Sequence, residues 1–233
     1  MNLFYASPSD ILENSVTIHG QEAKHISKVL RFGEGDTIQI TDGAGTLYNC
    51  IIERVHKERL TAIIERSEKE MRKLPHVTLC LGIIKKRDRL EFAVEKSVEL
   101  GADAILLFSA DNSEREKVRL DRVEGIVLSA MKQSKGLWLP EVYLANSLKD
   151  VVQKAGDDTT IVTADEQLNM TIDPEKIPDS RKYFLIVGPE GGFSKRERDF
   201  LNSMQSTRYS LGERRLRAET AAIVMVDRFK QLG

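Results

Sequence analysis

A chain of 233 residues exceeds the usual size of one domain but falls short of three, so we expect one large or two modest domains. With 41% hydrophobic and 30% charged residues, the composition is that of a globular protein and excludes a chain dominated by disorder. The net charge of -1 argues against a uniformly basic nucleic-acid-binding protein, although local clusters of Lys and Arg can still contact phosphates.

The two cysteines indicate a reducing environment and no metal site. Cys50 and Cys80 lie far apart in the sequence and outside any spacing that would form a zinc site or a disulfide framework. No apolar run is long enough to cross a bilayer, and the first residues lack the basic and apolar regions of an export signal. We therefore expect a cytoplasmic protein with neither a metal nor a membrane partner.

Residues 1–72 are predicted to form a small β-barrel-like module. Alternating apolar and polar residues at 37–40 and 47–52, punctuated by glycines, indicate short strands joined by tight turns. At 21–31 the apolar residues recur at helical spacing instead, which predicts a single helix that ends near Gly33.

Residues 73–233 are predicted to form a second, α/β domain, because strands and helices alternate as in a largely parallel sheet. The clearest helix is predicted over 88–100, since Leu90 and Val94 share one face and Gly101 can end the helix. Strands are predicted at 77–83, 104–108, 160–163, 183–187 and 208–211.

A glycine-rich segment follows the strand at 183–187. Residues 188–192 read Gly-Pro-Glu-Gly-Gly and precede a helical stretch that starts at Ser194. The carboxyl edge of a parallel sheet is where α/β proteins bind nucleotides, and glycine lets a ligand approach the backbone closely. The spacing matches neither a Walker loop nor a dinucleotide-binding fingerprint. A tight strand-to-helix turn without a ligand is the alternative interpretation.

A second segment, 211–222, combines a basic loop with the start of an apolar helix. Three arginines in four positions suit phosphate contacts, because the guanidinium fork matches phosphate oxygens, although a solvated loop explains them equally simply. Thr220 is predicted to cap the helix. The run 221–226 is apolar on nearly every side, which indicates either a deep core or a subunit interface.

Together, VGPEGGFS at 187–194 and LGERRLRAETAA at 211–222 resemble the signature loops of the SPOUT superfamily, specifically those of the bacterial 16S rRNA (uracil-N3)-methyltransferases of the RsmE type. This resemblance implies a PUA-like β-barrel at 1–72 and, at 73–233, a SPOUT domain, an α/β fold with a trefoil knot. Further matches occur in the family's order: HISKVLRFGEGD at 25–36, KKRDRLEFAVEKSVELGADAI at 85–105 and SAMKQSKGLWLPEV at 129–142.

The resemblance also implies S-adenosyl-L-methionine as the methyl donor and a uridine of 16S rRNA, in the small ribosomal subunit, as the target. Uracil N3 lies on the Watson–Crick edge, so the base would have to be exposed or flipped before methyl transfer. Arg217 is the candidate that stabilises negative charge on the base, and Glu219 is a candidate proton acceptor whose alternative role is to stabilise the helix start. The implied cofactor-binding residues are Thr163, Ala164, Val187, Gly188, Pro189, Glu190, Gly191, Gly192, Leu211, Gly212, Leu216 and Arg217.

Local clusters of basic residues predict an RNA-binding surface shared by both domains. The apolar run at 221–226 and the resemblance together predict a homodimer. The candidate RNA-binding residues are His25, Arg31, Lys85, Lys86, Arg89, Arg115, Lys135 and Arg214.

Some positions depart from the family pattern, and other functions stay open. Glu213 stands where a proline is usual and Arg215 where an aliphatic residue is common, which bears on the rigidity of the loop. Lys135 stands where a small residue or arginine is frequent. The alternatives are a SPOUT methyltransferase that acts on transfer RNA or on a ribose oxygen, and a non-catalytic RNA-binding protein that assists ribosome assembly.

Overall fold

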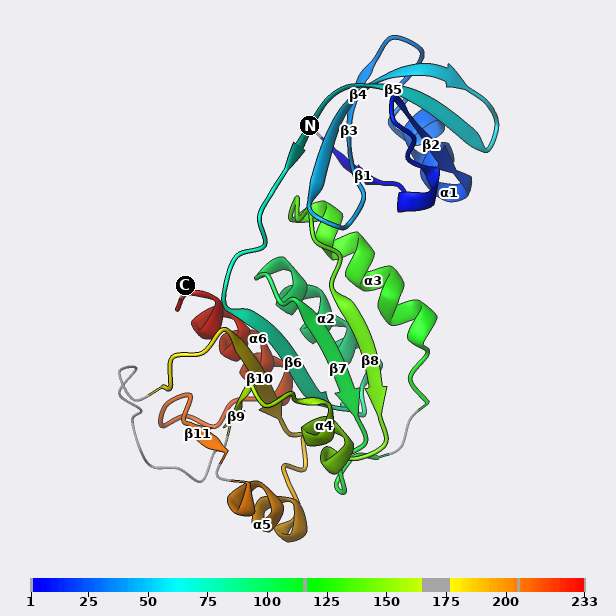
Figure 1. Cartoon of the computed structure of the whole chain (residues 1–233). Coiled ribbons are helices and arrows are strands. Elements are labelled where there is room, and N and C mark those ends of the chain that lie inside the picture. Colours follow the sequence, from blue (N-terminus) through cyan, green and yellow to red (C-terminus); the bar gives the residue numbers. More distant parts are fainter. Residues whose placement is uncertain (1, 115–116, 165–176, 205, 233) are drawn as a thin grey trace. The chain divides into compact units, whose positions relative to one another are not determined.

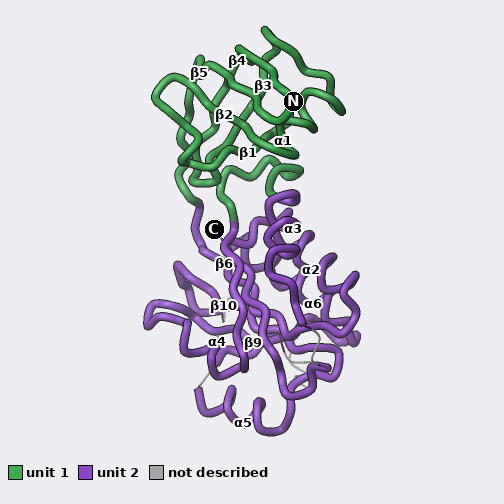
Figure 2. Tube along the Cα trace, turned by 90° about the vertical axis from the view of Figure 1, so that its right-hand side faces the viewer, with its two compact units in different colours: residues 1–72, 131–139 green, residues 73–130, 140–233 purple. Residues whose placement is uncertain are grey.

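The computed structural model describes residues 2–114, 117–164, 177–204 and 206–232. The chain divides into two compact units (Figure 2). The N-terminal unit comprises Met1–Arg72 and Met131–Leu139, and the C-terminal unit comprises Lys73–Ala130 and Pro140–Gly233. The sequence pattern indicates a single boundary, near residue 73, and gives no sign of the inserted segment.

Residues 131–139 belong to the N-terminal unit because their backbone pairs with a turn of that unit. The amide of Leu139 donates to the carbonyl of Gly43 at 2.8 Å, and the amide of Gly45 donates to the carbonyl of Leu137 at 2.9 Å. Gly45 has a φ of 91°, and a Cβ there would lie 2.3 Å from the Trp138 ring. Only glycine therefore fits beneath Trp138.

The N-terminal unit is built on a five-stranded sheet with the order β1-β3-β4-β5-β2 (Figure 1). β1 pairs with β3 in parallel, and the other pairs are antiparallel. Alternate side chains such as Ile38, Ile40 and Ile52 are buried in one core, as the sequence pattern predicts. The strands are β1 (Leu3–Tyr5), β2 (Ser15–His19), β3 (Thr37–Thr41), β4 (Thr46–Val55) and β5 (Arg59–Lys69), and a short 3-10 turn spans Pro8–Asp10.

The single helix predicted at 21–31 is wrong in its geometry. The chain forms α1 (Gly20–Lys24) and continues as a π-helical turn, η2 (His25–Val29), in which the amide of Leu30 donates to the carbonyl of His25. The extra residue in this turn keeps Ile26 in the core but leaves Val29 66% exposed, although helical spacing placed both on one face.

The C-terminal unit contains a six-stranded, entirely parallel sheet with the order β11-β9-β10-β6-β7-β8. The predicted parallel sheet is thus confirmed, and each predicted strand is present within two residues. β8 was not predicted, because an edge strand with exposed Tyr143 and Leu144 lacks a clear alternation. The strands are β6 (His76–Gly82), β7 (Ala104–Phe108), β8 (Glu141–Ala145), β9 (Thr160–Ala164), β10 (Lys182–Val187) and β11 (Thr207–Tyr209).

Helices pack against this sheet. α6 contacts α2 as well as β6 and β10, while α4 contacts β7 and β8. A separate cluster of buried side chains, which includes Phe108, Val151 and Leu201, forms part of the core. No helix among the described residues is long and apolar enough to span a membrane. The helices are α2 (Arg87–Glu99), α3 (Leu120–Gln133), α4 (Leu148–Lys154), α5 (Lys195–Ser203) and α6 (Ala218–Lys230).

α6 begins two residues before the predicted cap. The N-cap residue is Arg217, in an extended conformation, and its carbonyl accepts the Ala221 amide at 2.8 Å, so Thr220 lies inside the first turn and does not cap it. The apolar run of this helix is largely buried within the chain itself. Phe229 contacts Tyr183 and Tyr209 edge-on, with ring centroids 5.1 and 5.2 Å away.

Candidate active site

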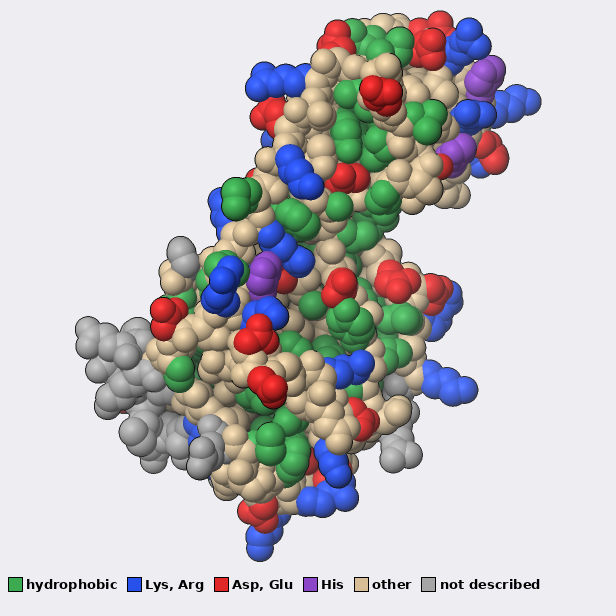
Figure 3. All heavy atoms as spheres, in the orientation of Figure 1, with side chains coloured by type: hydrophobic (Ala, Val, Ile, Leu, Met, Phe, Trp, Pro, Cys, Tyr) green, Lys and Arg blue, Asp and Glu red, His purple; other side chains and the backbone are tan. Residues whose placement is uncertain are grey.

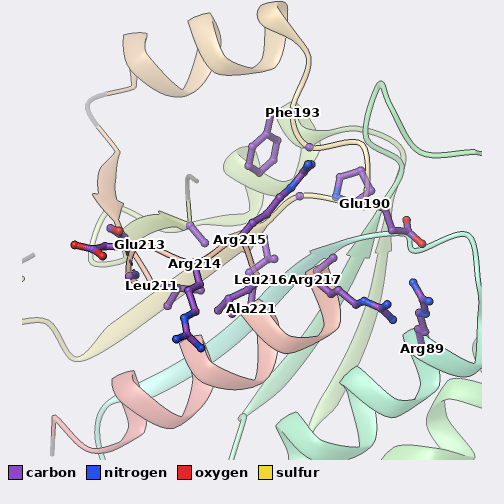
Figure 4. A pocket seen from close by; sticks show the side chains of 18 of the residues that line it. Arg89, Glu190, Phe193, Leu211, Glu213, Arg214, Arg215, Leu216, Arg217 and Ala221 are labelled. Atoms are coloured by element: carbon purple, nitrogen blue, oxygen red, sulfur yellow. Dashed lines mark hydrogen bonds between the residues drawn. The ribbon is translucent and has the colours of Figure 1, made fainter. Parts of the chain in front are cut away.

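A cleft of about 660 Å³ opens at the carboxyl ends of β9, β10 and β11 (Figure 4). This volume lies within the range that small-molecule sites occupy. The location follows from topology, because adjacent parallel strands end at the same edge and their outgoing loops enclose the crevice. The cleft is lined by Arg89, Ala164, Val187, Gly188, Pro189, Glu190, Gly192, Phe193, Arg198, Ser210, Leu211, Gly212, Glu213, Arg214, Arg215, Leu216, Arg217, Ala218 and Ala221.

The glycine-rich loop after β10 is held by the loop after β7. The Asn112 side-chain amide donates to the carbonyls of Gly191 and Gly192, at 3.1 and 3.2 Å. The amide of Gly192 donates to the carbonyl of Pro189 at 2.8 Å and closes a turn in which Gly192 has a φ of 65°. A Cβ on Gly192 would meet nothing within 4 Å. The loop therefore presents open backbone to the cleft.

The same β7 loop also braces the start of α5. Ser194 caps α5 and forms a capping box with Glu197. The Ser194 hydroxyl donates to Asp111 Oδ2 at 2.6 Å, and the Arg196 guanidinium donates to Asp111 Oδ1 at 2.5 Å. These two donors, the Ser194 hydroxyl first, lower the pKa of Asp111 below its usual value. Asp111 is therefore ionised at neutral pH and anchors the end of the glycine-rich loop.

The second loop, which follows β11, is the other wall of the cleft. Gly212 has a φ of 115°, and a Cβ at this position would meet nothing within 4 Å. The amide of Gly212 donates to the Ser210 hydroxyl at 3.3 Å. Glu213 and Arg215, the departures from the family pattern within this loop, both line the cleft rather than the core.

The lining of the whole cleft contains five arginines but only two acidic residues. Two of these arginines, Arg89 and Arg217, lie at the end where α2 approaches α6. Arg89 Nε lies 3.6 Å from Glu219 Oε1, and Arg217 Nη1 lies 4.0 Å from the same oxygen. The Glu219 side chain is only 10% exposed. Its second oxygen, Oε2, is buried and has no hydrogen-bond partner among the described residues.

Most of the predicted cofactor residues line this one cleft, but two do not. Thr163 is buried, with 2% of its surface exposed. Gly191 faces the protein, because a Cβ there would lie 3.0 Å from the Asn112 Cβ. Sequence reasoning missed Phe193, Arg198 and the first turn of α6 as lining residues. Arg198 carries no signal in the sequence, since an arginine on an amphipathic helix normally faces solvent.

The candidate RNA-binding residues are distributed over both units. His25, Arg31 and Lys135 are exposed on the N-terminal unit, and Arg115 lies outside the described residues. Arg89 and Arg214 line the cleft. On the face shown in Figure 3, basic side chains are interspersed with acidic ones in both units, so no single cationic surface dominates that view.

Lys85 and Lys86 border a second, more open hollow of the C-terminal unit. Its other lining residues include Glu91 and Arg122, which form a bidentate ion pair. The Arg122 guanidinium lowers the pKa of Glu91, so the carboxylate partly neutralises the basic rim.

Both units resemble domains of known proteins. Residues 71–230 match the model of the RNA methyltransferase domain, and residues 18–65 match that of the RNA methyltransferase PUA domain. The chain is 28% identical, over 220 residues, to the ribosomal RNA small subunit methyltransferase E of Bacillus subtilis. The alignment covers 89% of this chain and 86% of that protein.

Solved structures share the architecture over the whole chain. The ribosomal RNA small subunit methyltransferase E of Neisseria gonorrhoeae, bound to S-adenosyl methionine, has 28% identity and a TM-score of 0.86, covering 100% of this chain and 98% of that one. A predicted RNA methyltransferase from Thermotoga maritima has 32% identity and a TM-score of 0.78, covering 100% and 99%. The chain therefore belongs to the RNA methyltransferase family of the RsmE type, in which a PUA domain precedes a SPOUT-like methyltransferase domain.

Proposed function

We propose that the protein transfers a methyl group from S-adenosyl-L-methionine to N3 of a uracil in 16S rRNA. The observation that carries the proposal is the cleft at the carboxyl ends of β9, β10 and β11, which the two signature loops enclose. The similar protein from Neisseria gonorrhoeae, of the same architecture, binds S-adenosyl methionine. Uracil N3 as the target atom comes from the resemblance of the two loops to the family pattern.

The cleft fits this cofactor in size and chemistry. Its volume of about 660 Å³ suits a nucleoside-sized ligand. Gly192 and Gly212 adopt positive φ and leave open space where side chains would otherwise stand, so the backbone of both loops is accessible to the ligand. Most of the predicted cofactor-binding residues, from Ala164 to Arg217, line the cleft. Thr163 and Gly191 are not part of the lining and would support the lining residues instead.

The chain's own residues must position the base and manage its N3 proton. The bound cofactor would supply the electrophilic methyl group. Arg217 lies at the edge of the cleft with its side chain 69% exposed, where it can neutralise charge on the base oxygens. Glu219 is poorly placed as the proton acceptor, because Oε2 is buried and Oε1 faces two arginines. Its structural role is therefore favoured.

RNA binding is assigned to both units. In the N-terminal unit, His25, Arg31 and Lys135 would contact the RNA, because they are exposed. In the C-terminal unit, Lys85 and Lys86 would bind phosphates at the second hollow, and Arg89 and Arg214 would act at the cleft itself.

Nucleoside analysis of ribosomal RNA tests this function directly. In cells that lack the protein, 16S rRNA should lose 3-methyluridine, and expression of the chain should restore it. Loss of a methylated ribose or of a transfer RNA modification instead would favour the first alternative. Unchanged modification, together with a purified protein that binds RNA but not S-adenosylmethionine in calorimetry, would favour the assembly protein.

Asn112 is expected to hold the glycine-rich loop in its binding conformation. Asn112→Ala removes both hydrogen bonds to the carbonyls of Gly191 and Gly192, each worth about 1 kcal/mol. The affinity for S-adenosylhomocysteine, measured by calorimetry, should fall roughly tenfold, since 1.4 kcal/mol corresponds to a factor of ten. Ser109→Ala, earlier in the same loop, serves as the control. An Asn112→Ala protein with wild-type affinity would show that the loop holds its shape without this side chain.

The protein is also proposed to be a homodimer. Within one chain Ile223 and Val224, in the apolar run of α6, are only half-buried, which leaves apolar surface for a partner. Light scattering at micromolar concentration should give twice the monomer mass of 26.3 kDa. A single species at the monomer mass would contradict the proposal.

A further inference from the structure

Two arginines and one buried carboxylate meet at the end of the cleft between α2 and α6. Arg89 belongs to α2, Arg217 is the N-cap of α6, and Glu219 lies in the first turn of α6. Both guanidinium groups approach the same oxygen, Glu219 Oε1, at 3.6 and 4.0 Å. Figure 4 shows the Arg89 and Arg217 side chains directed toward the same end of the cleft. We call these three residues the arginine clamp.

The charges of the arginine clamp do not cancel. Two guanidinium groups face one carboxylate, so these three side chains together carry one net positive charge, while the Glu190 carboxylate lines the same end of the cleft (Figure 4). The distances to Glu219 are those of ion pairs and are longer than charge-assisted hydrogen bonds. Each guanidinium carries five N–H donors, so the carboxylate attracts the arginines without occupying most of their donors. The clamp can therefore accept one more anion.

Glu219 is placed to hold the arginines rather than to react. A general base must come within about 2.6–3.2 Å of the proton that it removes. Oε2 is buried and without a hydrogen-bond partner among the described residues, and Oε1 is shielded by two guanidinium groups. Arg89 itself is only 28% exposed, and its Nε lies 3.6 Å from Glu219 Oε1, so the carboxylate can orient the guanidinium.

We propose that the arginine clamp binds one negative charge carried on oxygen atoms of the RNA substrate, with Glu219 as the positioning residue. The proposal rests on the proposed function. The charge has two possible sources: O2 and O4 of the deprotonated target uracil, or a phosphodiester beside it. In the first case the N3 proton passes to water, and the charge left on the base is stabilised by the clamp. N3 then bonds to the methyl carbon, and the electron pair of the broken carbon–sulfur bond stays on sulfur.

Arg89→Gln tests the clamp, with Arg181→Gln as the matched control. Arg181 is an exposed arginine immediately before β10, at the opposite end of that strand from the cleft. In Arg89→Gln the maximal rate of methyl transfer should fall by about a hundredfold, as when one donor to a developing charge is removed. The affinity for S-adenosylhomocysteine should not change. Arg89→Lys, which keeps the charge but not the fork, should recover part of the rate.

Two measurements distinguish the sources of the charge. If the clamp binds the uracil anion, RNA containing 5-fluorouridine, whose N3 proton is more acidic, should restore much of the missing rate, and the salt dependence of RNA binding should not change. If it binds a phosphodiester, the slope of log affinity against log salt should become shallower by about 0.7, the value for one neutralised phosphate of single-stranded RNA. 5-Fluorouridine should then have no effect.

The role of Glu219 is tested by the pH dependence of Glu219→Gln. A positioning role lowers the rate at every pH but keeps the shape of the pH–rate profile, whereas loss of a general base removes the acidic limb. Arg217→Gln, at a more exposed position, replaces Arg89→Gln if thermal unfolding shows that the latter is not folded, with the rate measured at saturating S-adenosyl-L-methionine because Arg217 also lines the cofactor cleft. The clamp is wrong if folded Arg89→Gln or Arg217→Gln matches the control in both rate and salt slope. A wild-type protein that methylates no RNA would reject the proposed function and, with it, the uracil anion as the source of the charge, and the salt slope would then test the clamp as a phosphodiester site.

Discussion

Replacing Gly212 by valine is expected to lower the affinity for S-adenosylhomocysteine by at least about a hundredfold, which corresponds to roughly 2.8 kcal/mol. Gly212 has a φ of 115°, a region that residues with a Cβ rarely adopt. Its Cβ position points into open space, so a valine would not clash with the protein but would both strain the loop and occupy the cleft. Calorimetry on the full chain measures the change.

Gly125→Ala is the matched control for this substitution. Gly125 lies in α3, and a Cβ there also meets nothing within 4 Å, but its φ is not positive. Alanine at this position should leave the affinity unchanged and favour the helix by up to about 1 kcal/mol. Gly212→Ala, with less bulk, should fall between the two. Wild-type affinity in a folded Gly212→Val protein would place the ligand elsewhere.

The double variant Arg31→Gly/Lys135→Gly should bind 16S rRNA more weakly, by roughly tenfold or more at low salt, without loss of stability. Arg31 and Lys135 are the non-glycine residues with positive φ, 61° and 60°, in the described chain, and both are exposed. The Lys135 position ends a helical turn in which the amide of Gly136 donates to the carbonyl of Met131, an arrangement that favours glycine. Glycine therefore removes two charges while it relieves backbone strain.

The readout combines RNA binding with thermal unfolding. The slope of log affinity against log salt should become shallower by about 1.4, because each of the two phosphates that is no longer neutralised accounts for about 0.7. The melting temperature should stay the same or rise. The affinity for S-adenosylhomocysteine should not change. Lys57→Ala/Lys69→Ala removes two other exposed lysines of the N-terminal unit and serves as the control. A double glycine variant that binds RNA like this control would exclude both residues from the RNA interface.

Point variants distinguish the roles of the two units more clearly than a truncation of the chain does. Deletion of residues 1–72 would remove the turn with which Leu137 and Leu139 form backbone hydrogen bonds. It would also uncover Trp138, whose ring is stacked under the Arg72 guanidinium at 5.3 Å. A fall in methyl transfer after such a deletion could then reflect misfolding of the inserted segment rather than weaker RNA binding.

Local patterns in the sequence were sufficient to predict the helices and strands that are buried evenly along one or both faces. The helix over 88–100 and every strand of the parallel sheet except β8 were predicted within two residues, because burial on one face or both imposes a regular apolar pattern. The two signature loops were found because glycines and arginines at fixed spacing are visible without a structure. Their position after strands also placed them at one edge of the sheet.

Tertiary structure decided the features that depend on contacts between distant residues. The sequence by itself determined the α/β class, the family resemblance and most residues of the cleft. It did not predict that 131–139 joins the N-terminal unit, since backbone hydrogen bonds to a turn almost a hundred residues away leave no periodic signal. Likewise, only the packing of α2 beside α6 brings Arg89 close to Glu219. No local pattern in the sequence encodes this contact, because the two residues lie far apart along the chain. The contact makes Glu219, a carboxylate at the start of a helix, the centre of a charged cluster.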